Sequence, residues 1–407
     1  MAPNQKATAL DSFVDPSAPI CYGILKPGEH VSDGIPVIKV KNIIGGRILE
    51  DDLLRTSPQI HNQYKRAEVN QGDLLLTIRG TTGRVAIVPP SLSGANITQD
   101  TARIRVSSDD DPLYVFYALQ SPSVQRQIDL NTVGQAVKGI NIAEVRKLKI
   151  FHPADTEQKK IAQILSTWDK AITTTEQLLA NSQQQKKALM QQLLTGKKRL
   201  LDENGVRFGG EWREVSLSTI CQINPKKSPA PEDGKVSFIA MECVSEDAKL
   251  LSSSVREYDE VSKGFTSFAD DDVLVAKITP CFENGKGAYV ERMRNGIGFG
   301  STEFHVLRSG AKSDSKYLYY LTNTSEFRVR GEANMQGSAG QKRVTTDYLK
   351  SLKVTVPVKL SEQQKIASIL SIADQEITAF QQKLGALKQE KKALMQQLLT
   401  GKRRVIV

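Results

Sequence analysis

EQKKIAQILSTWDKAITTTEQLLANSQQQKKALMQQLLTGKKRL occupies residues 157–200, and EQQKIASILSIADQEITAFQQKLGALKQEKKALMQQLLTGKRRV occupies residues 362–405. The two segments align without a gap at an offset of 205 residues and share 27 identities in 44 positions. Residues 186–197 are identical to residues 391–402. Because the offset is about half of the 407-residue chain, the pattern indicates a tandem duplication in which a globular segment and a helix each occur twice.

The periodicity of both segments predicts long helices. Apolar residues recur at alternating steps of four and three, which is the pattern of a heptad seam sustained over more than four heptads. Neither segment contains proline, and each ends in Thr-Gly followed by Lys and Arg, as helix C-termini commonly do. A helix of about 40 residues would be ~60 Å long. The predicted seam residues are Ile161, Leu165, Trp168, Ile172, Leu179, Leu189 and Leu193, then Ile366, Leu370, Ile377, Phe380, Leu384, Leu394 and Leu398.

A single helix of this kind cannot bury its apolar stripe alone, so we expect the two helices to pack on each other. Residues 201–361 lie between them, which is enough chain to allow either orientation. A parallel pair would place both globules on the same side. We predict an antiparallel, coiled-coil-like spacer with one globule at each end and a pseudo-two-fold relation between the halves.

The two globular segments share an order of signals that predicts a mixed α+β domain used twice. Short β-rich runs come first, at 37–40, 74–78, 85–88 and 102–106 and at 236–239, 273–278, 288–290 and 304–307. An aromatic helical stretch follows at 114–119 and at 317–321, and a strand ended by proline closes each globule at 148–153 and 352–357. We therefore divide the chain into globules 1–156 and 201–361 and helical spacers 157–200 and 362–407.

The composition excludes several classes of protein. Hydrophobic residues make up 39% and charged residues 25%, which fits a folded protein. No stretch approaches ~18 consecutive apolar residues, so no membrane span is expected. The start lacks the apolar core of a secretory signal. The four cysteines are far apart with no C-x-x-C pair, so we expect reduced thiols in a cytoplasmic protein.

The basic surplus lies on the predicted helices. The net charge is +10, of which residues 157–200 carry +5 (eight basic, three acidic) and residues 362–405 carry +4 (eight basic, four acidic). The rest of the chain has 39 basic and 38 acidic residues. Net charge therefore gives no argument that the globules bind a polyanion, although local patches remain possible.

The sequence contains no catalytic constellation. None of the four Gly-Lys pairs completes a P-loop, no H-E-x-x-H motif is present, and the only Pro-Pro lacks the flanking residues of an amino-methyltransferase motif. The Asp233-Gly-Lys235 triplet has a form used by metal nucleases, but so short a pattern arises by chance. The acidic run 270–272 fits a solvated turn better than a metal site. These observations indicate a non-catalytic protein.

The repeated block, with its EQ-x-K-I-A-x-I-L-S start and K-K-A-L-M-Q-Q-L-L-T-G-K end, resembles the conserved helical regions of type I restriction–modification specificity (S) subunits. Segments 72–88, 279–288 and 298–306 are similar to the target recognition domains of that family. The resemblance covers nearly the whole chain. It implies two recognition domains that each read one half of a bipartite, asymmetric double-stranded DNA site.

The resemblance also implies partners. The helices of such a subunit would set the half-site spacing and dock two modification subunits, which methylate adenine. Two ATP-driven restriction subunits would complete the nuclease. S-adenosylmethionine, ATP and magnesium are then expected on the partner subunits and no cofactor on this chain. Two other classes remain open: a duplicated adaptor that recruits two partners without contacting DNA, and a self-contained enzyme, which the missing motifs disfavour.

Candidate DNA contacts are polar and basic residues in glycine-containing loops, where the backbone can approach a groove. Many of them could equally be solvated turn residues. The candidates are Lys39, Lys41, Asn42, Arg79, Thr81, Thr82, Arg84 and Lys138 in the first globule, and Lys277, Asn284, Lys286, Gln341, Lys342 and Arg343 in the second.

The identity of residues 186–197 with their second copy includes polar residues that an apolar seam does not require. Recent duplication would explain it, but the globules have diverged while these residues have not. We therefore predict a surface for two copies of one partner, formed by Lys187, Gln191, Gln192, Lys197, Lys392, Gln396, Gln397 and Lys402. Trp168 fits the helix seam better than a platform for stacking bases.

Overall fold

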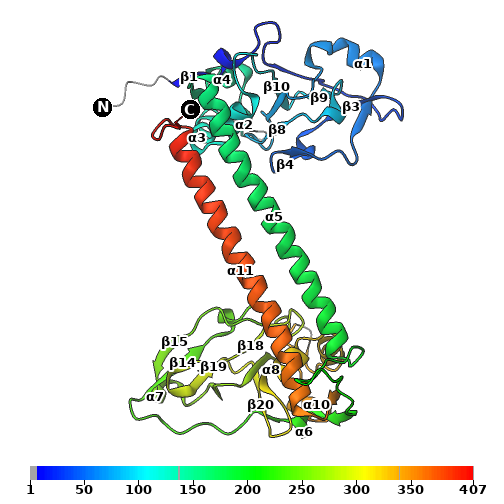
Figure 1. Ribbon diagram of the computed structural model, residues 1–407, viewed down its shortest axis with the longest axis vertical. Helices are drawn as coiled ribbons and strands as arrows, with labels where there is room; N and C mark the ends of the chain where they lie inside the picture. The colour runs from blue at the N-terminus through cyan, green and yellow to red at the C-terminus, as the bar shows by residue number, and fades with distance from the viewer. Residues whose placement is uncertain (1–6, 136–137, 339, 407) are drawn as a thin grey trace. The chain divides into compact units, whose positions relative to one another are not determined.

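A computed structural model describes residues 7–135, 138–338 and 340–406. The chain divides into two compact units, one formed by Met1–Glu176 with Gln382–Val407 and the other by Gln177–Gln381. Each unit contains one globule and a segment from each of the long helices α5 (Asp155–Leu193) and α11 (Leu360–Leu398) (Figure 1).

The first globule is built from short strands and short helices. Its strands pair as β2-β10-β7-β8, β6-β3-β9, β1-β11 and β4-β5. The elements are β1 (Ala7–Ala9), β2 (Cys21–Tyr22), β3 (Ile35–Ile38), β4 (Ile43–Ile44), β5 (Arg47–Ile48), β6 (Leu54–Thr56), α1 (Pro58–Gln63), β7 (Leu74–Thr77), β8 (Val85–Ile87), β9 (Asn96–Ile97), β10 (Thr101–Ile104), α2 (Pro112–Gln120), α3 (Pro122–Leu130), α4 (Ile142–Lys147) and β11 (Lys149–Phe151).

The second globule repeats this plan. Its sheets are β13-β20-β17-β18, β15-β14-β19-β16 and β12-β21, so the second sheet gains the strand β16. The elements are β12 (Trp212–Ser216), α6 (Leu217–Ile220), β13 (Cys221–Ile223), β14 (Lys235–Ile239), β15 (Ser254–Glu257), α7 (Tyr258–Val261), β16 (Thr266–Ala269), β17 (Val273–Ala276), β18 (Gly287–Tyr289), β19 (Ile297–Gly300), β20 (Phe304–Ser309), α8 (Ser315–Thr322), α9 (Ser325–Ala333), α10 (Thr346–Ser351) and β21 (Lys353–Pro357).

The predicted tandem α+β architecture is confirmed, because each of the strands and aromatic helices expected from the sequence is present in its globule. One partly buried ion pair occurs in both globules at equivalent positions. The carboxylate of Asp73 accepts two hydrogen bonds from Arg105, at 2.8 and 2.7 Å, and Asp272 accepts two from Arg308 at the same distances. Such bidentate pairs are strong and geometrically specific, so they fix the first strand of each hairpin against its neighbour.

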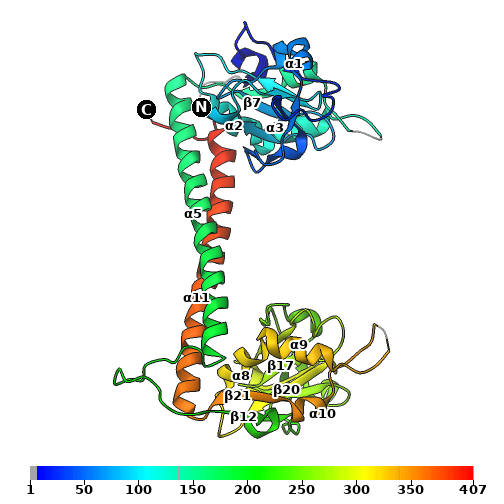
Figure 2. The same ribbon diagram turned by 90° about the vertical axis from the view of Figure 1, so that its right-hand side faces the viewer.

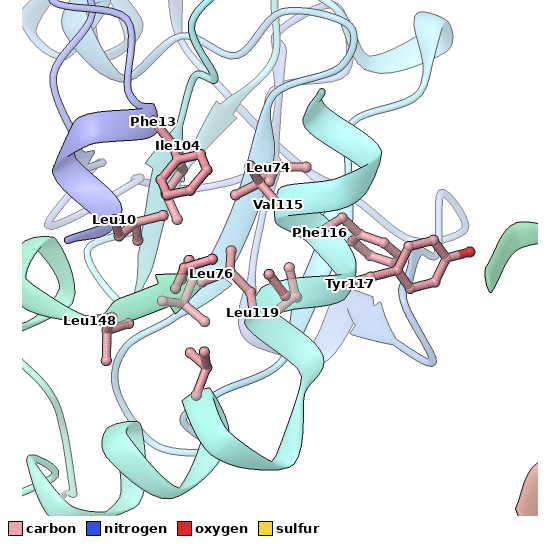
Figure 3. Packing of buried hydrophobic residues seen from close by; sticks show 14 of the residues in the cluster. Leu10, Phe13, Leu74, Leu76, Ile104, Val115, Phe116, Tyr117, Leu119 and Leu148 are labelled. Atoms are coloured by element: carbon pink, nitrogen blue, oxygen red, sulfur yellow. The ribbon is translucent and has the colours of Figure 1, made fainter. Parts of the chain in front are cut away.

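The core of the first globule includes the ends of both long helices. Leu74 and Leu76 of β7 pack with Ile104 of β10 against the apolar face of α2 (Figure 3). Ile161 and Leu165 of α5 and Leu398 of α11 are buried in the same cluster. In the second unit, Ile366 and Leu370 of α11 and Leu193 of α5 are buried in the equivalent cluster. Each globule therefore shares its hydrophobic core with the ends of the two helices in its own unit.

Within each unit the two helical segments run antiparallel and lie side by side (Figures 1 and 2). In the first unit Glu157 pairs with Arg404 and Glu176 with Lys388, so residue numbers rise along one helix as they fall along the other. In the second unit the same holds for Lys186 with Asp374 and Arg199 with Glu362.

Both helices end three residues before the glycines that the sequence indicates, and the chain turns at those glycines. Gly196 and Gly401 have φ values of 68° and 71°, a conformation that glycine adopts without strain. The backbone N–H of Lys198 donates to Gln192 O at 3.0 Å, and that of Arg403 donates to Gln397 O at 3.1 Å. These bonds satisfy carbonyl groups that the helix leaves without partners.

Candidate nucleic-acid interface

Two loops meet on the surface of the first globule. The β7–β8 hairpin loop runs from Ile78 to Arg84, and a second loop precedes α4 and includes Lys138. The N–H of Gly80 donates to Lys138 O at 2.9 Å, and the N–H of Ile140 donates to Ile78 O at 2.9 Å. Candidates that lie about 55 residues apart in the sequence are thereby brought together; residues 136 and 137 of the second loop lie outside the described residues.

The second globule joins its equivalent loops in the same way. The N–H of Thr279, in the β17–β18 loop, donates to Lys342 O at 2.9 Å, and the N–H of Val344 donates to Lys277 O at 2.9 Å. We call the joined loops, 78–84 with 138–140 and 277–286 with 341–344, the loop surfaces of the two globules. Two separate groups of predicted residues thus form one surface in each globule.

In the first loop surface the side chains differ in how freely they reach solvent. Arg79, Thr81 and Lys138 are exposed and Thr82 is half-buried. Within the part of the chain that the structure describes, no carboxylate lies within salt-bridge distance of Arg79 or Lys138. These two cations are therefore available to an external anion such as a phosphate.

Arg84 is engaged inside the globule. Its Nη1 donates to Ile43 O at 3.1 Å and to Val40 O at 3.5 Å, which holds the turn at 40–43 beside the hairpin loop. Lys286 of the second globule occupies the matching place, since its Nζ donates to Met241 O at 3.3 Å. Both cations thus hold a neighbouring backbone segment against the hairpin loop, and their predicted contact with DNA stays a prediction.

The turn at 39–42 also departs from the expectation. Asn42 is only 4% exposed, and its Oδ1 accepts a hydrogen bond from the N–H of Lys39 at 3.0 Å. Its side chain shapes the turn, so the prediction that Asn42 contacts DNA does not fit its burial. Lys39 is half-buried, and Lys41 is exposed and paired with Asp52 at 3.0 Å.

In the second loop surface, Gln341 and Lys342 are exposed and Lys277 is half-buried. Asn284 is exposed and donates to Glu246 Oε1 at 2.9 Å. Arg343 donates to Glu303 at 2.8 Å, and this guanidinium lowers the pKa of the Glu303 carboxyl. Arg343 is therefore neutralised by a neighbour, whereas no carboxylate of the described residues lies within salt-bridge distance of Lys277 or Lys342.

A contact that the sequence reasoning missed ties the first globule to the helices. The hydroxyl of Tyr117, on α2, donates to Asp169 Oδ2 at 2.7 Å, and Lys391 Nζ donates to Asp169 Oδ1 at 2.5 Å. The Lys391 ammonium also lies 5.2 Å from the centre of the Tyr117 ring. Burial and the Asp169 carboxylate raise the pKa of Tyr117, so its hydroxyl stays protonated as a donor.

The second unit repeats this Tyr–Asp–Lys clamp with Tyr320, Asp374 and Lys186. Tyr320 donates to Asp374 Oδ2 at 2.8 Å and Lys186 donates to Asp374 Oδ1 at 2.6 Å. A signal was present in the sequence, because Asp169 and Asp374 stand at matching positions of the repeat and Lys186 and Lys391 begin its identical run. Both lysines stand at positions of the apolar period.

The predicted helix-seam residues are all buried or half-buried where the structure describes them, Trp168 included. Those near the globules, such as Ile161 and Leu370, belong to the two main cores. Those far from the globules, such as Leu179 and Leu384, are half-buried along the helices.

The predicted partner residues are exposed in both copies. Apolar members of the identical run, such as Leu193 and Leu398, are buried in the cores, and the predicted partner residues face outward. In the second unit, the side chains of the run line a groove of about 740 Å³ between the end of α5 and the globule. The exposed residues are Lys187, Gln191, Gln192 and Lys197, and Lys392, Gln396, Gln397 and Lys402.

The described residues offer no group of three or more His, Cys, Asp or Glu side chains that could hold a metal ion. Among the helices in the described ranges, none is both long and apolar enough to cross a membrane.

Comparison with a family model shows two matching regions. Residues 28–181 and 209–389 each match the type I restriction modification DNA specificity domain. Together these regions cover most of the chain and include both loop surfaces.

Similar individual proteins include specificity subunits of type I restriction enzymes. The chain is 38% identical over 172 residues to the specificity subunit of the type I restriction enzyme EcoAI from Escherichia coli, a match covering 40% of this chain and 29% of that relative. It is 23% identical over 365 residues to the MjaVIII specificity subunit from Methanocaldococcus jannaschii, covering 84% and 81% of the two chains. The chain thus matches only 29% of the length of the EcoAI relative.

Solved structures show the same fold. The S subunit of a type I restriction–modification system from M. genitalium aligns over 98% of both chains with a TM-score of 0.58 and 14% identity. The HsdS subunit from Thermoanaerobacter tengcongensis also aligns over 98% of both chains, with a TM-score of 0.51 and 18% identity.

Proposed function

The chain belongs to the type I restriction–modification DNA specificity family, and from this premise we propose that it is the non-catalytic specificity subunit of such a complex. Each loop surface reads one half of a bipartite, asymmetric site in double-stranded DNA. The protein supplies sequence selection, and the chemistry belongs to its partners.

One observation carries this proposal: the two loop surfaces share their backbone hydrogen bonds, whereas the exposed side chains of their hairpins differ. Gly80 and Thr279 donate to equivalent carbonyls, at Lys138 and Lys342. The hairpin of the first globule presents Arg79 and Thr81, whereas that of the second presents Asn284. Since base edges are read by side-chain donors and acceptors, unlike side chains on like frames suit two different half-sites.

Phosphate contacts complete the proposed interface. Arg79 and Lys138 in the first globule, and Lys277 and Lys342 in the second, are cations without a carboxylate partner among the described residues. Such side chains orient a protein on the DNA backbone and make its affinity dependent on salt. The small net charge of the globules is compatible with this role, because phosphate contacts need only a few cations that lie in the loop surfaces.

The helices set the distance between the half-sites in this proposal. Each contains 39 residues, or about 58 Å at ~1.5 Å per residue. That length corresponds to at most about 17 base pairs, since each base pair adds ~3.4 Å. Two half-sites separated by unread base pairs fit within this limit.

The exposed residues of the identical run dock two modification subunits, one at each copy. Lys187 and Gln191 and their counterparts Lys392 and Gln396 are not needed by either core. Those subunits bring S-adenosylmethionine and methylate adenine, and two restriction subunits bring ATP and magnesium.

The proposal is tested by mapping adenine methylation in the host genome with and without this gene. We expect its deletion to remove methylation from one bipartite motif whose two halves differ. A duplicated adaptor that does not contact DNA would also be needed for methylation, so a second step separates the two. Replacing Arg79 and Thr81 by alanine changes the methylated motif if the chain reads DNA and leaves it unchanged if the chain is an adaptor.

A further inference from the structure

Gln125 and Arg328 occupy equivalent positions in the two globules. Gln125 lies four residues after Ser121, whose hydroxyl caps α3, and Arg328 lies four residues after Thr324, whose hydroxyl caps α9. Neither residue belongs to a loop surface. Both side chains nevertheless extend from their helices to the hairpin loop of their own globule.

In the first globule, the Gln125 amide joins the loop to the helical layer. Its Nε2 donates to Gly83 O at 2.9 Å and to Leu119 O, at the end of α2, at 2.7 Å. Gly83 has a φ of 84°, and a Cβ built there would lie 2.5 Å from Gln125 Oε1. The amide thus fits closely against the turn that follows Thr81 and Thr82.

In the second globule, the Arg328 guanidinium makes a larger set of contacts. Its Nη1 donates to Phe282 O at 3.2 Å, and its Nη2 donates to Gly285 O at 3.2 Å and to Asn323 Oδ1 at 3.1 Å. The guanidinium carbon lies 5.1 Å from the centre of the Phe282 ring. Gly285 has a φ of 85°, so it marks the same turn as Gly83.

The Arg328 guanidinium is held by neutral groups only. Its hydrogen-bond acceptors are two carbonyls and one amide, and no carboxylate of the described residues lies within salt-bridge distance of it. Burial lowers the pKa of Arg328 to about 10, which leaves it charged at neutral pH. A planar guanidinium carries five N–H donors in a fixed geometry, so Arg328 contacts two carbonyls of its loop and the Asn323 side chain together. The amide of Gln125 has only two N–H donors and contacts one carbonyl of its loop.

We propose that Arg328 and Gln125 are positioning residues, each of which sets the conformation of one recognition loop and thereby the base selectivity of one half-site. This proposal rests on the proposed function. The fork of Arg328 fixes two carbonyls of the 277–286 loop, while Gln125 fixes one carbonyl of the 78–84 loop. Because base discrimination needs donors and acceptors placed to within about 0.5 Å, a side chain behind the loop controls what the loop reads.

The experiment uses the full-length chain assembled with its modification subunits and measures methylation of DNA duplexes. Each duplex carries the wild-type motif or a single base change in one half-site. We expect Arg328→Gln to reduce discrimination about tenfold in the half-site of the second globule and to leave the other half-site unchanged. Gln125→Leu has the reciprocal result, because it removes the donor to Gly83 and keeps a similar volume.

Matched controls separate positioning from charge and from folding. Arg328→Lys keeps the charge but loses the fork, so it should resemble Arg328→Gln; full rescue by lysine would overturn the positioning role. Arg256→Gln removes another guanidinium of the second globule, one that lies 5.9 Å from the Phe238 ring. Within the described part of the chain, its side chain has no hydrogen bond or salt bridge to the 277–286 loop. This variant should retain wild-type discrimination at both half-sites.

The outcomes also separate this proposal from the proposed function. Wild-type chain that supports no sequence-selective methylation would contradict the proposed function itself. Selective wild-type methylation with unchanged discrimination in both Arg328→Gln and Gln125→Leu would overturn only the positioning role. Equal loss at both half-sites from either variant would also overturn it, because the two loops would then not be set independently. If Arg328→Gln fails to fold, Gln125→Leu alone decides the question.

Discussion

The junctions between globule and helices differ from the loop surfaces in what the duplication has kept. At the junctions the side chains themselves are repeated: Tyr117, Asp169 and Lys391 reappear as Tyr320, Asp374 and Lys186 with nearly the same distances. At the loop surfaces the backbone hydrogen bonds are repeated, whereas the exposed side chains of the hairpins differ. A duplicated protein must hold both globules on the helices in one way, whereas two loop surfaces that read different half-sites, as we propose, gain from being different.

The largest effect is expected in the shared cores. Leu165 and Leu370 are equivalent residues, both fully buried where a long helix enters a globule. Replacing either by alanine removes buried methyl groups and leaves a cavity, at a cost of about 2–5 kcal/mol. Urea unfolding of the two variants should show similar losses. A loss at one position only would contradict the equivalence of the junctions.

The next effect concerns DNA binding and should be confined to one loop surface. Arg79→Ala is expected to cost about 1–3 kcal/mol if Arg79 contacts a base, and only in the half-site of the first globule. Binding of the assembled complex to duplexes with altered half-sites measures it, with Asn284→Ala as the reciprocal variant. An equal loss in both half-sites would indicate damage to the whole protein.

The Tyr–Asp–Lys clamp should give a smaller effect. Asp169→Asn keeps the shape of the side chain but removes the charge that Lys391 and Tyr117 contact. We expect a loss of about 1–2 kcal/mol, reduced by the partial exposure of Asp169. Asp374→Asn should cost a similar amount. A double-mutant cycle with Lys391→Met measures the coupling, and zero coupling would show that the clamp contributes nothing.

The smallest effect is a pH dependence at Glu157. Its contacts with Arg404 lower its pKa below the usual 4.5, so the folded state binds this proton more weakly than the unfolded state. The stability from this pair is therefore fully present above about pH 4.5 and is lost as the pH falls through the lowered value. Glu157→Gln should flatten the acid limb of the stability profile, and an unchanged limb would exclude this contribution.

The sequence was sufficient for the repeated parts of the fold. The apolar period and the Thr-Gly ends predicted two long helices, and the short β-rich runs predicted the strands of both globules. These features are local, because period and turn residues act over a few positions. Gly196 and Gly401, for example, turn the chain just after the ends of the two helices, as the pattern indicates.

The candidate site was less accessible from the sequence, because residue type and loop position do not give the direction of a side chain. Asn42 was predicted to face a ligand and instead caps a turn, and Arg84 binds backbone carbonyls. Gln125 and Arg328 were missed since they lie on helices 42 and 43 residues from the loop glycines they contact. Only the tertiary fold brings such partners together.

The most direct test of the account is the methylation motif produced by a chain with four extra residues inserted in both α5 and α11. Four residues add about 6 Å of helix without changing either loop surface. We predict that sequencing of methylated adenines will find the same two half-sites with a longer unread spacer. A motif with altered half-site bases, or with its spacer unchanged, would contradict the account.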